Sequence, residues 1–258
     1  MTTTESSGGG DVSRSLELLW GTGERAARGP KPGLSLGRIV TAAVAIADAE
    51  GLAAVSMRRL SAELGAGTMS LYRHVPGRAE LVDLMLDRVQ GEPVRLPRQD
   101  TAVPREDGAP GWRATVETAA RAELALYRAH PWLLSVNQTR PVLGPGAVGG
   151  MEAMLAGLTG TGLTDPELIS VIVMVSGYVS GVARSHLQTV EARTASGVGD
   201  DEFWQSQEPV LTEVMSSGRY PVMAGLSAEA FAPDFDHFEF GLQRLLDGLA
   251  VLVEQRTG

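Results

Sequence analysis

The stretch SMRRLSAELGAGTMSLYRHVPGR, residues 56–78, decides the fold of the N-terminal part of this chain. Ser56 is a good N-cap for a first helix, in which Leu60 and Leu64 lie on one face. Residues 65–67 contain two glycines and predict a turn. Such a turn lets the next helix cross the first at a steep angle, which is the geometry of a helix-turn-helix.

The second helix of this pair is predicted over residues 68–75. Leu71 and Val75 lie four residues apart, so both can face the core. The opposite face combines small hydroxyls, an aromatic ring and a cation, which suit hydrogen bonds to base edges and phosphates; it consists of Thr68, Ser70, Tyr72, Arg73 and His74. Arg58 and Arg78 can hold phosphates on either side. A plain helical hairpin with a polar outside is the alternative, and the specialised face argues against it.

Two further helices complete a compact frame around this pair. Residues 36–50 place apolar side chains at the 3.6-residue period of a helix with one buried face, and Gly51 ends it. Residues 78–90 form a connecting helix whose inward side chains are Leu81, Leu84, Met85 and Val89.

Residues 34–91 resemble the DNA-binding domain of the tetracycline-repressor (TetR) family. The resemblance rests on the AEGL that ends the opening helix (residues 49–52), on SMRRLSAELG, and above all on TMSLYRHV followed by a turn and a new helix. It implies an operator-reading surface made by Arg58, Thr68, Met69, Ser70, Tyr72, Arg73, His74 and Arg78.

Composition bounds the function of the chain, which has 258 residues, a formal net charge of −9 and no cysteine. The negative charge is unusual for a DNA-binding protein, but residues 21–91 carry nine Lys and Arg against seven Asp and Glu. The lack of cysteine excludes disulfides and thiolate metal sites. The four histidines lie far apart without ligand spacing, so no cofactor or metal site is expected.

No stretch carries the pattern of a catalytic site. G-x-S-x-G and H-E-x-x-H are absent, and no glycine-rich phosphate loop follows a strand pattern. The N-terminus has neither a basic start nor an apolar run, and the most apolar segment, residues 168–183, is shorter than a bilayer requires. We therefore expect a cytoplasmic protein that is no enzyme and has no membrane partner.

The chain divides into an arm, a head and a body. Residues 1–33 are expected to form a flexible arm, whose stretch GTGERAARGPKPG is either solvated or laid along a DNA groove. Residues 34–91 form the helix-turn-helix head, and residues 92–258 form the body after a proline-containing boundary. The body shows no strand pattern, so the whole fold is predicted to be all-α; its helices are expected over residues 112–129, 132–138, 148–158, 165–189, 202–217 and 236–254.

Two late helices of the body are candidates for a dimer interface. Thr164-Asp165-Pro166-Glu167 forms a capping box, and the helix that follows is apolar nearly all round. The last helix has an apolar seam, with Gly241 and Gly248 permitting close approach. Both helices could be plain core, but TetR-like proteins dimerise through a four-helix bundle of two late helices per subunit. That resemblance implies an interface of Val175, Val179, Val182, Phe238, Leu242, Leu245, Leu249 and Leu252.

A ligand pocket is expected among the middle helices, where apolar walls carry a few polar groups. The candidates, each of which could also be plain packing, are Tyr127, His130, Trp132, Asn137, Gln138, Met151, Met154, Tyr178 and His186. Thr139-Arg140-Pro141 resembles a run near the drug site of tetracycline repressors. Two drug-site histidines of those repressors correspond to Val136 and Gln90 here, so magnesium–tetracycline chemistry is not supported.

The sequence thus predicts a ligand-responsive regulator, a homodimeric repressor that a small molecule releases from a palindromic operator in double-stranded DNA. The alternative is a ligand-binding or scaffolding helical protein without specific DNA reading. Operator binding that falls steeply with salt would distinguish the two.

Overall fold

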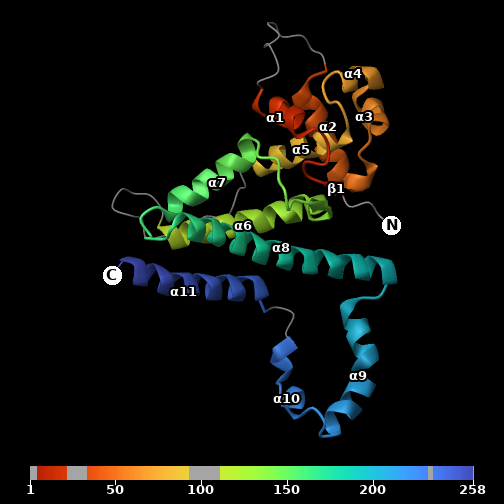
Figure 1. The fold of residues 1–258 in the computed structure, drawn as a ribbon. Helices are drawn as coiled ribbons and strands as arrows, with labels where there is room; N and C mark the ends of the chain where they lie inside the picture. The colour runs from red at the N-terminus through yellow and green to blue at the C-terminus, as the bar shows by residue number, and fades with distance from the viewer. Residues whose placement is uncertain (1–4, 22–33, 93–110, 232–234, 258) are drawn as a thin grey trace.

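The computed structural model describes residues 5–21, 34–92, 111–231 and 235–257, and this part of the chain is almost wholly helical (Figure 1). The elements of the N-terminal part are β1 (Glu5–Ser6), α1 (Val12–Trp20), α2 (Leu36–Glu50), the 3-10 helix η1 (Leu52–Ala54), α3 (Met57–Leu64), α4 (Thr68–Tyr72) and α5 (Arg78–Gln90). The elements that follow are α6 (Trp112–Ala129), η2 (Pro131–Ser135), β2 (Val136–Asn137), α7 (Pro145–Leu158), α8 (Asp165–Ser196), α9 (Asp200–Ser216), α10 (Pro221–Ala224), η3 (Ala228–Phe231) and α11 (His237–Thr257).

The head contains the predicted helices in the predicted order. The Ser56 side chain caps α3 by accepting a hydrogen bond from the Arg59 amide, and Gly65 ends α3 with a φ of 61°, a left-handed value that favours glycine. Leu71 and Val75 are fully buried, as the sequence predicted. Helix α4 ends at Tyr72, three residues earlier than expected. The residue before a proline is disfavoured in the helical region, and the chain turns ahead of Pro76.

The core of the body lies between α6, α8 and α11, which run alongside one another (Figure 1). Its fully buried side chains come from all three helices and include Val116, Ala120, Val179, Leu242 and Leu246. The α8 start is the predicted capping box, in which the Thr164 amide donates to the Glu167 carboxylate at 2.8 Å. Helix α8 extends to Ser196, where Gly197 closes it in a left-handed conformation.

The N-terminal segment corrects two expectations, a flexible arm and the absence of strands. Residues 5–21 form β1 and α1, and β1 pairs in parallel with β2. Leu18 of α1 packs into the core of the head. The remaining arm residues, 1–4 and 22–33, lie outside the described ranges, and so do the cations Arg25, Arg28 and Lys31.

Helices α9 and α10 project from the body (Figure 1) and are called here the α9–α10 arm, which is distinct from the N-terminal arm of residues 1–33. Neither helix buries a single residue against the rest of the described chain. Large apolar side chains on this arm are more than half exposed, among them Phe203, Trp204, Val210 and Val222. Contiguous exposed apolar surface of this kind marks an interaction surface.

The packing of α8 and α11 corrects part of the predicted dimer interface. Val175, Val179, Phe238, Leu242 and Leu249 are buried in the core of their own chain, so they cannot form the surface that a partner meets. Val182, Leu245 and Leu252 are half-buried. An apolar sequence pattern identifies a helix that must be covered, but it does not say which face the chain itself covers.

Helix α8 is, within the described ranges, long and apolar enough to span a membrane by length and composition alone. The core helix of a soluble protein passes the same test. Helix α8 is longer than the sequence predicted, and 22% of its apolar window is buried inside the described structure, through Val171, Val175, Val179 and Ala183, so its other faces stay uncovered.

Candidate DNA-binding face and effector cavity

The DNA-binding candidates gather on the exposed side of α3 and α4. Met69 of α4 is 71% exposed and Tyr72 is 46% exposed, although Leu71 between them is fully buried. Thr68 and Arg73 are exposed too, and Ser70 and His74 are half-buried beside them. Because α4 is anchored by its buried leucine, it can present the other side chains as a rigid reading surface.

The arginines near this face fall into two groups. Arg58 and Arg73 are exposed, and within the described residues neither forms an ion pair, so both are free to meet phosphates. Arg59 is engaged by Glu50 and Glu63, each at 2.8 Å.

Arg78, which the sequence assigned to a phosphate contact, also has partners within the chain. Its guanidinium bonds the Glu5 carboxylate and the Leu52 carbonyl oxygen, each at 2.9 Å. These two bonds use two of the five N–H groups of the guanidinium and hold β1 against the head, and the other N–H groups stay available.

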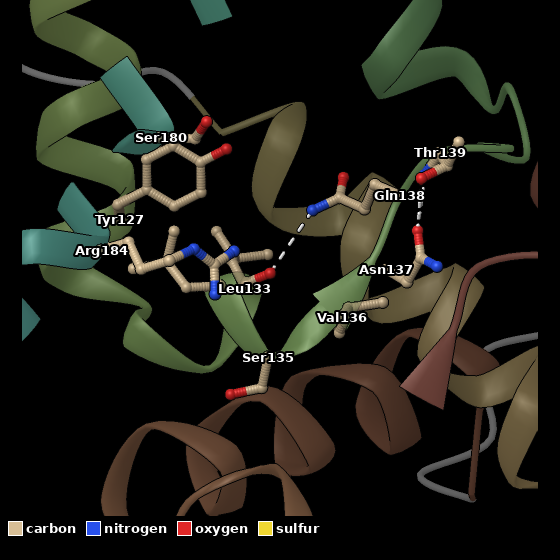
Figure 2. Close-up of a pocket in the computed structure, with 10 residues that line it drawn as sticks. Tyr127, Leu133, Ser135, Val136, Asn137, Gln138, Thr139, Ser180 and Arg184 are labelled. Atoms are coloured by element: carbon tan, nitrogen blue, oxygen red, sulfur yellow. Dashed lines mark hydrogen bonds between the residues drawn. The ribbon is translucent and has the colours of Figure 1, made fainter. Parts of the chain in front are cut away.

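A cavity of about 410 Å³ opens between α6, α8 and the η2–β2 segment (Figure 2). This volume suits a small organic ligand, since such pockets measure about 300–1,000 Å³. Its walls combine aliphatic side chains with hydroxyl, amide and guanidinium groups; they are Tyr127, Leu133, Leu134, Ser135, Val136, Asn137, Gln138, Thr139, Ser180 and Arg184.

The cavity contains some of the predicted ligand residues and not others. Tyr127 and Gln138 line it, and so do Asn137, Thr139 and the Val136 that the TetR resemblance singled out. Other predicted ligand residues lie elsewhere: Trp132 and Met154 are buried in the cores of the chain, Tyr178 packs on Phe238, and His186 is exposed. Ser180 and Arg184 were missed, although both follow Ser176 on one face of α8 at steps of four residues.

A half-buried acid, Glu123, lies behind the cavity wall. The Tyr127 hydroxyl donates to Glu123 at 3.3 Å, and the Ser176 hydroxyl donates to the other carboxylate oxygen at 3.0 Å. Burial raises the pKa of Glu123, and the two hydrogen bonds offset this only in part. Burial, followed by the neighbouring Glu123 charge, also raises the pKa of Tyr127.

Three polar contacts connect the cavity region to the head. Gln138, a cavity residue, accepts a hydrogen bond at 3.1 Å from Gln90, the last residue of α5. At a second point Asp48 of α2 accepts from the Trp132 indole at 2.7 Å and pairs with His130 Nδ1 at 2.7 Å. The cavity residues Leu133 and Val136 also belong to the hydrophobic core of the head. Through these contacts a displacement of the cavity wall can be transmitted directly to α5 and α2.

Within the part of the chain that the structure describes, no group of His, Asp and Glu side chains could hold a metal ion. The described residues combine an exposed helix α4 with a cavity large enough for a small molecule, and hydrogen bonds join the cavity region to α2 and α5. That combination defines a helix-turn-helix regulator of transcription whose DNA-binding head is joined to a ligand-sized cavity.

Comparisons with known proteins identify the family. Residues 39–85 match the model for bacterial regulatory proteins of the tetR family, and residues 103–253 match the model for the tetracyclin repressor-like C-terminal domain. The chain is 61% identical over 255 residues to the HTH-type transcriptional repressor DrrR1 of Streptomyces coeruleorubidus, covering 99% of this chain and 92% of that protein. It is 32% identical to an HTH-type transcriptional regulator of Saccharopolyspora erythraea, over 90% of this chain and 91% of that protein.

A solved structure shares the architecture. ActR of Streptomyces coelicolor, in complex with actinorhodin, superposes with a TM-score of 0.66 at 29% sequence identity, covering 86% of this chain and 97% of ActR. The chain therefore belongs to the TetR family, and it is a transcriptional repressor of that family and not an enzyme.

Proposed function

We propose that this repressor is a homodimer that reads a palindromic operator through α4 and leaves it when a small molecule fills the cavity between α6, α8 and β2. The observation that carries the proposal is the pairing of an exposed, anchored α4 with a cavity whose wall is hydrogen-bonded to α5. We divide the chain into a head, residues 34–91, and a body, residues 92–258, with residues 1–33 as an N-terminal extension.

For operator reading we assign base contacts to α4 and phosphate contacts to the free arginines. Tyr72 and Met69 stand out from α4 and can reach base edges, while Arg58 and Arg73 can reach the two flanking phosphate strands. Arg78 also binds Glu5 and the Leu52 carbonyl oxygen, and with its remaining N–H groups it stays a candidate for a phosphate contact. The operator DNA of a bacterial repressor lies in the cytoplasm, so the protein is expected to act there.

For dimerisation we assign the faces of α8 and α11 that the chain leaves uncovered. Val173 on α8 is 66% exposed, and on α11 Phe240 and Val251 are 53% and 55% exposed. Around them Gly177 and Gly248 have no neighbour within 4 Å of an added Cβ, so a partner helix can approach closely. The apolar α9–α10 arm is a second surface that a partner subunit would cover.

For the effector we infer a small molecule that binds to Tyr127, Gln138 and Arg184. ActR, the solved relative, has been obtained with actinorhodin and with (S)-DNPA bound. An effector that contacts Gln138 competes with its bond to Gln90 and thereby changes how α5 sits. The effector then acts through its different affinity for the two positions of the head.

The test is a titration of the purified protein against its own upstream intergenic DNA, beside a scrambled duplex, at two salt concentrations. We expect tight binding to the upstream fragment alone and a steep fall with salt. Tyr72→Ala and Arg73→Ala should each weaken this binding by at least about tenfold without lowering the melting temperature. Wild-type affinity in both variants would show that α4 is not the reading surface.

A further inference from the structure

The N-terminal segment, residues 5–20, joins the cavity wall to the head. We refer to this segment, β1 with α1, as the strap. Its strand pairs in parallel with β2, with Glu5 beside Val136 and Ser6 beside Asn137. The Ser7 amide extends the ladder by donating to the Asn137 carbonyl oxygen at 3.0 Å. Both β2 residues line the cavity, so the strap is the outer layer of that wall.

One hydroxyl group connects the loop after β2 to α5. Ser7 Oγ accepts a hydrogen bond from the Val142 amide at 3.1 Å and donates to Asp83 Oδ1 at 3.0 Å. At the other end of the strap, the Trp20 indole donates to the Leu143 carbonyl oxygen at 3.1 Å. The strap thus contacts both ends of the segment 136–143, at residues 136–137 and at residues 142–143.

On the α5 side, the contacts converge on two buried carboxylates. Asp83 is 2% exposed and also accepts from the Gly8 amide at 2.9 Å and from the Ser15 hydroxyl at 2.8 Å. Glu80, one turn earlier, accepts from the Asp11 amide at 2.8 Å, and a Cβ on Gly10 would overlap the Glu80 carboxylate. Bonds to buried charged groups are the strong ones, and they fix the strap to the middle of α5.

We propose that the strap transmits occupancy of the effector cavity to α5, with Ser7, Ser15 and Asp83 as the positioning residues. A displacement of β2 moves β1 and Ser7, and Ser7 moves Asp83 at the centre of α5. This route is separate from the Gln138–Gln90 contact, which reaches only the last residue of α5. The proposal rests on the proposed function, because it requires that the cavity control DNA binding.

The experiment replaces the unidentified effector by a built-in occupant of the cavity. Ser180→Trp puts an indole into the cavity from α8, and its effect on affinity for the upstream DNA is measured in three backgrounds. These are the wild-type strap, the double variant Ser7→Ala/Ser15→Ala, and the matched control Ser13→Ala. Ser13 is an exposed serine on α1, the helix that also contains Ser15. Trp20→Phe is a milder second strap variant, which removes only the half-exposed indole donor.

We expect Ser180→Trp to weaken DNA binding about tenfold or more with the wild-type strap and with Ser13→Ala, a typical coupling. In Ser7→Ala/Ser15→Ala the loss should shrink to about twofold, and Trp20→Phe should give an intermediate loss. An equal loss in every background would overturn the strap and leave the effector cavity standing. No loss with the wild-type strap would instead remove the cavity from control of DNA binding, and the strap with it.

Hydrogen exchange gives a readout that does not depend on DNA. In Ser7→Ala/Ser15→Ala the amides of residues 136–143 and of the middle of α5 should exchange faster than in Ser13→Ala, because both lose the strap contacts. Unchanged exchange in both segments, in a variant with wild-type helical content, would show that the strap holds neither.

Discussion

Gly241→Ala tests the contact between Gly241 of α11 and Tyr178 of α8. A Cβ at this position would overlap the Tyr178 hydroxyl and lie 2.6 Å from its Cζ. The Tyr178 hydroxyl donates to the carbonyl oxygens of His237 and Phe238, at 3.0 and 2.9 Å, and its ring stacks on Phe238 with centroids 5.9 Å apart. One added methyl group must therefore displace an aromatic ring that is fixed at both ends.

The magnitude follows from what the ring loses. The shared hydroxyl hydrogen bond contributes about 1 kcal/mol, the ring pair about 0.5–1.5 kcal/mol, and overpacking costs about 1–3 kcal/mol. Alanine regains about 1 kcal/mol through its better helix propensity. We expect a net loss of about 1.5–4.5 kcal/mol in the free energy of unfolding, which lowers the melting temperature by about 3–18 °C for a chain of this size.

The assay is thermal unfolding followed by circular dichroism at one protein concentration. The matched control is Gly150→Ala, at an exposed glycine inside α7 where an added Cβ meets nothing within 4 Å. That variant should be as stable as the wild type or slightly more so. If Gly241→Ala had the same melting temperature as Gly150→Ala, the Tyr178 contact would contribute none of the stability assigned to it.

Two further predictions concern the half-buried Glu123 and the dimer face. Because burial raises the pKa of Glu123, the folded state holds this proton more tightly than the unfolded chain, and the carboxyl lowers stability as the pH rises above its ordinary range. Glu123→Gln should thus have a higher melting temperature than the wild type at pH 8 and the same melting temperature near pH 4. A difference in melting temperature that did not change with pH would contradict this cause. Val173→Glu on the uncovered face of α8 should give monomers by light scattering, whereas Ala153→Glu on exposed α7 should not. A dimeric Val173→Glu at the same concentration would place the interface elsewhere.

The reading head could be predicted from the sequence because its rules are local. Ser56, Gly65 and Pro76 set the ends of α3 and α4, and the spacing of Leu71 and Val75 decides which side of α4 is buried. All of these lie within one stretch of 23 residues, residues 56–78, so no distant part of the chain can change the pattern.

Long-range pairing decided what the sequence could not. The glycines and serines of the N-terminal residues predict a mobile arm, but the Ser7 hydroxyl and the Gly8 amide donate to Asp83, and the Asp11 amide donates to Glu80, about seventy positions away in the chain. The cavity likewise combines α6, η2, β2 and α8, and its residues Ser180 and Arg184 carry no motif of their own.

The sequence by itself predicted the helix-turn-helix and the all-α fold, because capping and periodicity act between near neighbours, and the class of protein followed from the resemblance of residues 34–91 to the TetR family. Only the tertiary structure decided which face of α8 is free. Val173 and Val175 are equally apolar, yet one is 66% exposed and the other 1% exposed, because α6 and α11 cover one side of the helix alone. Hydrophobicity states that a side chain favours burial, and the packing of distant helices determines whether its own chain or a partner buries it.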